Sequence, residues 1–131
     1  MIDRRTALAF GLVIAAFAAG PAFAATAAIP FSSAAFEAAQ KSGKSILVEI
    51  HADWCPTCKA QAPIISELRD DPKFKDLIVF RVDYDGQKDV VKKLGARMQS
   101  TLITFKGSSE KGRSVGDTDK GSIQALLSKA I

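Results

Sequence analysis

The sequence predicts one α/β domain, built on a central mixed sheet of about four strands with helices on both faces. Three segments consist almost entirely of apolar residues, which is typical of strands buried on both faces of a sheet, and they span residues 45–51, 77–82 and 101–105. Segments of helical composition separate these strands, and such alternation favours parallel pairing. A turn that opens at residues 107–109 leads to an edge strand at 112–115, so the last pair must be antiparallel.

Residues that cap or stop helices mark the segments between the strands. Ser32 and Ser33 are candidate N-caps for the first helix, and Pro56 suits the first turn of the second. The four helices are expected at residues 34–41, 56–69 and 87–94, and from a cap at Asp117 or Thr118 to Ala130.

The first two dozen residues have the pattern of an export signal. Arg4 and Arg5 precede a dense apolar run at residues 7–19, which has the length of a secretory core and is short for a bilayer span. A small-x-small tripeptide follows at residues 22–24, which predicts a cleaved signal peptide over residues 1–24. The alternatives are an uncleaved membrane anchor and a twin-arginine signal, which the Arg4–Arg5 pair partly matches.

The mature chain is expected to start at Ala25, with a flexible lead over residues 25–30 and a folded thiol domain over residues 31–131. Removal of residues 1–24 takes two arginines and one aspartate from a net charge of +4, which leaves +3. The basic residues are not clustered, which argues against a nucleic-acid partner. The predicted location is the periplasm, where disulfides form and are handled by dedicated enzymes.

The chain has two cysteines, and their spacing indicates reactivity. Cys55 and Cys58 close too short a loop to stabilise the fold much, and with one histidine they are too few for a four-ligand zinc site. The pair lies between a buried strand and a helix, where a C-x-x-C sequence indicates redox chemistry. The alternatives are a permanent disulfide, two idle buried thiols, or a shared metal or iron–sulfur site.

The position of each cysteine suggests its role. Cys55 falls at the start of the helix, where free backbone N–H groups and the helix dipole stabilise a thiolate, so we expect an accessible nucleophile there. Cys58 lies one turn later on the same face. Cys55 would attack a disulfide of the partner, and Cys58 would resolve the mixed disulfide. We expect no cofactor and no metal ligand, because the Cys55–Cys58 disulfide itself carries the electrons.

The residues around this pair resemble the active site of the thioredoxin family. Ile46–Lys59 is similar to the active-site strand and helix, and Pro63 matches the proline within that helix. Residues 95–107 resemble the substrate-binding loop and the next strand. The sequence of Ala52–Cys55 is most similar to that of periplasmic thioredoxin-like proteins that pass electrons to other exported thiol proteins. The resemblance implies a thioredoxin-like fold and thiol–disulfide oxidoreductase activity.

The resemblance also implies which other residues take part. Glu49 matches a buried carboxylate behind the second cysteine, and burial would favour its protonated form, so that it could exchange a proton with Cys58. The alternative is a Glu49 that points to solvent or pairs with Arg81. With Cys55, Cys58 and Glu49 as the catalytic residues, those expected to bind the partner are Trp54, Pro56, Thr57, Gln99, Ser100 and Thr101.

Ser100 is a departure, because the family has a cis-proline at this position. A cis bond before a residue other than proline costs roughly 2.5–4 kcal/mol, so we expect a trans bond between Gln99 and Ser100. Serine restores a backbone donor and adds a hydroxyl beside the sulfurs, and it removes the ring that keeps metals from the dithiol in the family. We expect it to alter the choice of partner and the release of the mixed disulfide, and to leave the basic exchange intact.

The function expected from these residues is that of an exported, monomeric reductant or electron relay. Its partners would be exported proteins with disulfides, and a membrane thiol transporter would supply the electrons. Pro56 and Thr57 between the cysteines match the usual sequence of neither reductants nor oxidants, so a dithiol oxidant or isomerase is an alternative. A module that binds a metal- or cytochrome-maturation partner without turnover is another.

Overall fold

The computed structural model describes residues 27–131, and its strands form one mixed five-stranded sheet. The order is β1-β3-β2-β4-β5. The strands are β1 (Ile29–Pro30), β2 (Ser45–His51), β3 (Ile78–Asp83), β4 (Thr101–Lys106) and β5 (Ser109–Val115). β3 pairs in parallel with β1 and β2, whereas β4 runs antiparallel to β2 and β5. The predicted α/β architecture with its antiparallel final pair is confirmed, with one strand more than expected.

The additional strand, β1, lies in the segment expected to be a flexible lead. Ile29 and Pro30 pair with Phe80 and Arg81 of β3, so the prediction of a flexible lead is wrong for these two residues. Two residues are too few to show an alternating pattern, which is why the sequence does not indicate this strand. The predicted signal peptide lies outside the described residues. No helix within residues 27–131 is both long and apolar enough to cross a membrane.

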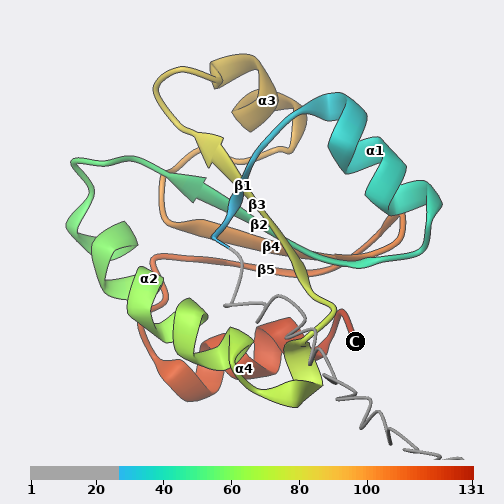
Figure 1. Ribbon diagram of the computed structural model, residues 1–131. Coiled ribbons are helices and arrows are strands. Elements are labelled where there is room, and N and C mark those ends of the chain that lie inside the picture. The colour runs from blue at the N-terminus through green and yellow to red at the C-terminus, as the bar shows by residue number, and fades with distance from the viewer. Residues whose placement is uncertain (1–26) are drawn as a thin grey trace, which may run out of the picture.

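Helices cover both faces of the sheet, as Figure 1 shows. On one face lie α1 (Ser33–Lys41) and α3 (Lys88–Lys93), and on the other lie α2 (Pro56–Arg69) and α4 (Lys120–Ser128). The alternation of side chains along β2 matches these two layers. Ile46, Val48 and Ile50 belong to the core beneath α1 and α3, whereas Leu47 belongs to the core beneath α2 and α4.

The ends of the helices follow local capping chemistry. β2 and α2 have the predicted bounds, and Ser32 caps α1 as expected by accepting the N–H of Ala35 at 3.2 Å. The cap of α4 is Asp119, which accepts the N–H of Ser122 at 2.8 Å, so the expected cap at Asp117 or Thr118 is wrong. α4 ends at Ser128, and a short 3-10 helix, η1 (Pro72–Phe74), follows α2.

The cysteines lie at one end of the sheet, where Cys55 ends the loop after β2 and Cys58 belongs to the first turn of α2. Cys55 and Cys58 pack with Ala52 and the half-buried Tyr84 in a small cluster, and Tyr84 also packs against the core beneath α1 and α3. The loop that precedes β4 reaches the same end, because the N–H of Ser100 donates to the carbonyl of Ile50 at 2.8 Å. The fold therefore brings two segments that are distant in sequence to the dithiol.

Candidate active site

Cys55 is the N-cap of α2. Its Sγ accepts the backbone N–H of Cys58 at 3.1 Å, and its own N–H donates to the carbonyl of Ala52 at 3.1 Å. Pro56 occupies the first position of the helix, where its missing N–H leaves no donor unpaired. This geometry aims a helix N–H and the positive end of the helix dipole at the sulfur, which stabilises a thiolate there.

Cys58 lies one helical turn behind in a different environment. Burial is the main cause that raises the pKa of the Cys58 thiol above its ordinary value of 9.0, and a hydrogen bond with the Cys55 side chain acts in the same direction. Backbone hydrogen bonds with Ala52 and Ser100 lower the pKa without cancelling this rise. Both cysteines are free thiols in this structure. Cys58 is therefore a neutral thiol at physiological pH, directly behind a sulfur that accepts a helix N–H.

Cys55 differs from expectation in its exposure. The sequence predicts an accessible nucleophile, yet Cys55 is only 1% exposed, so this prediction is wrong for the structure described. Its neighbours in sequence are open to solvent, because Trp54 is 56% exposed and Pro56 is also exposed. Tyr84 packs against the cysteine cluster from another segment. Cys55 is therefore buried in this structure, and Tyr84 is one of the side chains packed against its cluster.

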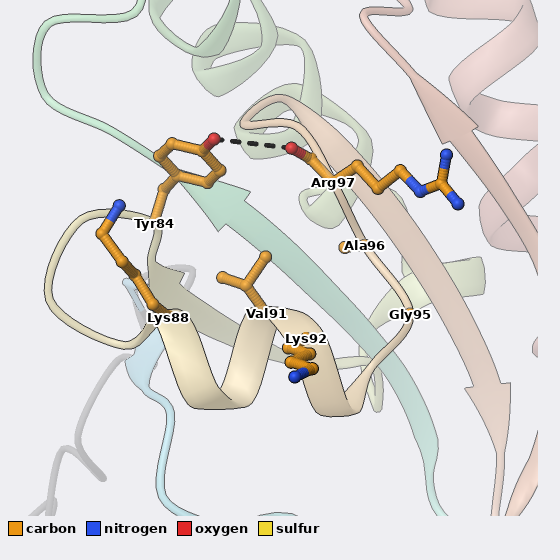
Figure 2. Close-up of a pocket in the computed structure, with 7 residues that line it drawn as sticks. All are labelled: Tyr84, Lys88, Val91, Lys92, Gly95, Ala96 and Arg97. Carbon is orange, nitrogen blue, oxygen red and sulfur yellow. Dashed lines mark hydrogen bonds between the residues drawn. The ribbon is translucent and has the colours of Figure 1, made fainter.

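Trp54 and Tyr84 form a connected cover at the dithiol. The Trp54 indole N–H donates to Asp85 Oδ2 at 2.6 Å, and its ring meets the Tyr84 ring edge-on with centroids 6.4 Å apart. The Tyr84 hydroxyl donates to the carbonyl of Arg97 at 3.4 Å (Figure 2). The sequence prediction missed Tyr84 and Asp85. Their place directly after β3 was the available signal, because the carboxyl ends of parallel neighbours such as β2 and β3 meet at one edge.

Glu49 points to the face of the sheet that α2 covers. It borders a cavity of about 220 Å³ that is also lined by Ala62 of α2, one turn beyond Cys58. Glu49 is 7% exposed, and its carboxylate accepts a hydrogen bond from Arg81 Nε at 2.6 Å. The structure thus shows the pairing with Arg81 that the sequence left open as the alternative, in a position still next to the helix that carries the dithiol.

Ser100 has an unusual backbone. The described residues contain no cis peptide bond, so the bond before Ser100 is trans, as predicted. Its φ is +59°, and it is the one non-glycine residue of the described chain with a positive φ. Three hydrogen bonds hold it there: its N–H donates to Ile50, and its carbonyl accepts from Gly116 N–H at 3.0 Å and from Gln61 Nε2 at 3.2 Å. A strained backbone that several contacts hold in place is characteristic of functional loops.

The comparisons with known proteins agree on one family. A family model described as Thioredoxin matches residues 27–129. The chain belongs to the thioredoxin family. A thioredoxin H-type from Brassica campestris is 36% identical over 93 residues, 71% of this chain and 73% of the relative. Thioredoxin-2 from Saccharomyces cerevisiae is 33% identical over 98 residues, 74% of this chain and 92% of the relative.

Solved structures are similar in the same region. Trxlp from Edwardsiella tarda has a TM-score of 0.74 and 40% sequence identity, over 77% of this chain and 98% of its own. The thioredoxin NaTrxh from Nicotiana alata has a TM-score of 0.69 and 28% identity, over 79% and 91%. This thioredoxin-family protein is accordingly a thiol–disulfide oxidoreductase with its close cysteine pair at the start of α2.

The remaining predicted partner-binding residues of this thioredoxin-family protein differ in exposure. Thr57 and Gln99 are half-buried at the surface beside the dithiol. Thr101 is 1% exposed, and its hydroxyl donates to the carbonyl of Met98 at 2.7 Å, so this side chain holds the loop and does not face a partner. Met98, which the sequence prediction missed, is 49% exposed on the same loop.

Thioredoxin chemistry needs only the two sulfurs, and the site offers no obvious alternative centre. Within residues 27–131, no group of three or more His, Cys, Asp or Glu side chains is placed to hold a metal ion. The arrangement directs a helix N–H at Cys55 Sγ, while burial keeps the proton on Cys58.

Proposed function

We propose that this thioredoxin-family protein is exported and acts in the periplasm as a reductant or electron relay for exported proteins with disulfides. The signal-like pattern of residues 1–24 supports export. One observation carries the chemistry: the N–H of Cys58 stabilises Cys55 Sγ, while burial keeps Cys58 itself protonated. A dithiol with one nucleophile and one reserved thiol suits a two-step exchange.

The exchange starts from the reduced dithiol. The Cys55 thiolate attacks one sulfur of the partner's disulfide, a Cys55–partner disulfide forms, and the other partner sulfur leaves as a thiolate that takes a proton. Cys58 then loses its proton and attacks Cys55 Sγ. The Cys55–Cys58 disulfide forms, the second partner sulfur leaves as a thiol, and two electrons have passed to the partner. A membrane thiol transporter would return the dithiol to its reduced form.

Neighbouring residues would assist each step. Glu49, on the α2 face of the sheet, would accept the proton that leaves Cys58 when Arg81 releases the carboxylate. The exposed and half-buried side chains around the dithiol would contact the partner. The backbone of the loop before Ser100 would pair with the partner's extended chain, since the N–H and carbonyl of Ser100 itself are bonded within the protein. The residues in this surface are Trp54, Pro56, Thr57 and Gln99, and the buried Ser100 would act by fixing the shape of the loop.

Single-cysteine variants test the proposed roles. Reduction of insulin disulfides should be lost in both Cys55→Ser and Cys58→Ser under catalytic conditions. Only Cys58→Ser should accumulate a mixed disulfide with the substrate, visible as a mass increase that a reducing agent reverses. Activity that survives both substitutions would reject the dithiol mechanism. Absence of insulin reduction by the unmodified protein would favour a binding module without turnover.

The reduction potential of the Cys55–Cys58 couple tests the direction of electron flow. Equilibration with glutathione of known ratio should give a strongly reducing value, near the roughly −270 mV typical of thioredoxin. A value nearer the roughly −120 mV of the periplasmic dithiol oxidant would assign the protein to oxidation or isomerisation. The same exchange chemistry serves both directions, so this measurement separates them.

A further inference from the structure

A cavity beside the dithiol has a composition that the exchange chemistry does not require. It has a volume of about 410 Å³ and is formed by α3 and the loop that follows it (Figure 2). Its apolar inner surface includes the buried side chains of Val91 and Ala96, and Tyr84 forms one wall. The cavity therefore offers both an apolar floor and an aromatic side.

The charged side chains that line this cavity are all cationic. Lys88, Lys92 and Arg97 contribute to its lining, and no aspartate or glutamate does. Lys88 and Arg97 extend on opposite sides of the cavity in Figure 2, and Lys88 Nζ lies 5.4 Å from the centre of the Tyr84 ring. Three positive charges around an apolar floor would attract a carboxylate-bearing segment and repel a cationic one.

Another depression, on the His51 side, is of mixed charge. It has a volume of about 370 Å³, and its lining includes His51, Asp53, Asp83 and Arg81. Charges of opposite sign cancel much of their field there, so this depression would not select a partner by charge. Of these two depressions, the one beside α3 is therefore the better suited to select a partner by charge.

Tyr84 connects the cationic cavity to the reacting sulfurs. It lines the cavity and also packs against the Cys55–Cys58 cluster. Arg97, on the opposite wall, is followed in sequence by the exposed Met98 and then by the Ser100 loop. A segment lying in the cavity would therefore continue directly onto the surface where the partner's disulfide must sit.

We propose that this cavity selects protein partners that carry acidic residues next to the disulfide that is exchanged. The occupant is an extended segment of the partner, with carboxylates paired to Lys88, Lys92 and Arg97 and an apolar side chain on Val91 and Ala96. This inference rests on the proposed thiol–disulfide exchange and names the class of substrate for it. The lysines position the substrate and take no part in the chemistry.

Charge-matched peptide substrates test the proposal. Three synthetic peptides with the same intramolecular disulfide carry flanking glutamates, glutamines or lysines, and kcat/KM is measured with the reduced mature chain. The unmodified protein should favour the glutamate peptide over the lysine peptide by about tenfold at low ionic strength, and about 1 M salt should remove most of the difference.

Two double variants locate the effect. Lys88→Gln with Lys92→Gln should reduce the ratio between the two charged peptides to about twofold or less, since two of the three cations are gone. Lys75→Gln with Lys111→Gln removes the same charge from exposed positions that do not line the cavity, and it should leave the ratio unchanged. A ratio near one in the unmodified protein, or one that survives in the cavity variant, would overturn the proposal.

Further readouts separate this proposal from the proposed function. The rate at which a small uncharged disulfide is reduced depends on the dithiol and not on the charge of the cavity. Both double variants should therefore reduce it as fast as the unmodified protein does. Binding of the same peptides with alanine in place of cysteine is followed by the fluorescence of Trp54, the one tryptophan of the chain, which contacts Tyr84. This measures charge selection even if no disulfide is reduced. Competition by millimolar inorganic phosphate as strong as that of the acidic peptide would instead identify a small-anion site and refute the proposal.

Discussion

Ser100 shows how one residue can depart from the family pattern while its loop keeps a defined shape. A left-handed backbone costs an L-residue with a side chain roughly 1–2 kcal/mol. Three hydrogen bonds to the backbone groups of Ser100, one of them from the Gln61 side chain, hold it in this conformation. The sequence indicates the trans bond, because only proline makes a cis bond cheap. It does not indicate the positive φ, which arises from contacts with Ile50 and Gly116 in distant segments.

The cost of this backbone can be measured with two substitutions at Ser100. Glycine adopts a positive φ freely and alanine does not, so Ser100→Gly should exceed Ser100→Ala in free energy of unfolding by about 1 kcal/mol. Urea denaturation of the reduced proteins gives this difference. Equal stability of the two variants would show that position 100 does not keep a left-handed backbone in solution.

Cys58 makes the stability of the reduced protein sensitive to alkaline pH. Its folded-state pKa is raised, mainly by burial, above the ordinary value of 9.0. Below pH 9 the thiol is protonated in both the folded and the unfolded chain and contributes no pH dependence. Above pH 9 the unfolded chain releases this proton first, so the folded state is progressively destabilised until the folded thiol also ionises.

The pH dependence has a definite sign and a limiting slope. Relative to Cys58→Ser, which cannot ionise in this range, the reduced protein should lose stability above pH 9 by at most about 1.4 kcal/mol per pH unit. Chemical denaturation between pH 7 and about 11, with reductant present, measures the difference at each pH. A difference that stays constant or grows in favour of the unmodified protein would contradict the raised pKa.

The burial of Cys55 is the clearest failure of prediction at this scale. The C-x-x-C spacing and the helix start identify the reactive pair, but they carry no information about which distant side chains cover it. Tyr84 comes from the segment after β3 and reaches the cysteines only in the folded chain. Exposure at an active site is therefore a tertiary property, whereas the type and spacing of the reacting groups are local ones.

Removal of the Tyr84 ring should uncover the nucleophile. Tyr84→Ala should raise the rate of iodoacetamide alkylation at Cys55 by about tenfold, equivalent to about 1.4 kcal/mol less opening free energy. Tyr84→Phe keeps the ring and should alkylate at nearly the unmodified rate. Fragment mass spectrometry assigns the modified cysteine, and equal rates in all three proteins would show that Tyr84 does not control access.

At the level of elements, the bounds of a helix or strand were predicted correctly where one sequence feature marked them clearly. The nearly continuous apolar run of β2 and the proline at the start of α2 gave their bounds to the residue. The start of α4 was misplaced because Asp117, Thr118 and Asp119 are all suitable caps. The choice depends on the folded loop, in which Asp117 accepts the N–H of Asp119 at 3.0 Å and leaves Asp119 to cap the helix.

The α4 cap can be tested by substitution. Asp119→Ala should lower the free energy of unfolding by about 1 kcal/mol, because the N–H of Ser122 loses its acceptor at the helix start. Asp119→Asn keeps a capping oxygen and should cost much less. Parallel urea denaturation of the two variants provides the comparison, and a loss of similar size at both would point to the charge of Asp119 rather than to its capping hydrogen bond.

At the scale of the whole molecule, the proposed role depends on export. Production in a bacterial host should place the protein in the periplasmic fraction, with an intact mass that corresponds to a chain starting at Ala25. Retention of the full-length mass in the membrane fraction would establish an uncleaved anchor instead. Failure of export in a host that lacks the twin-arginine translocon would identify Arg4 and Arg5 as part of that signal.

The two edge strands of the sheet, β1 and β5, affect whether copies of the protein associate with one another. β1 is two residues long and includes Pro30, which has no N–H to donate, and β5 presents Glu110, Lys111 and Arg113 beside a register irregularity at Thr104–Phe105. Short, charged or irregular borders discourage a neighbouring chain from adding a strand. We therefore expect concentrated solutions to remain free of fibrils, even though β2 and β4 are largely apolar.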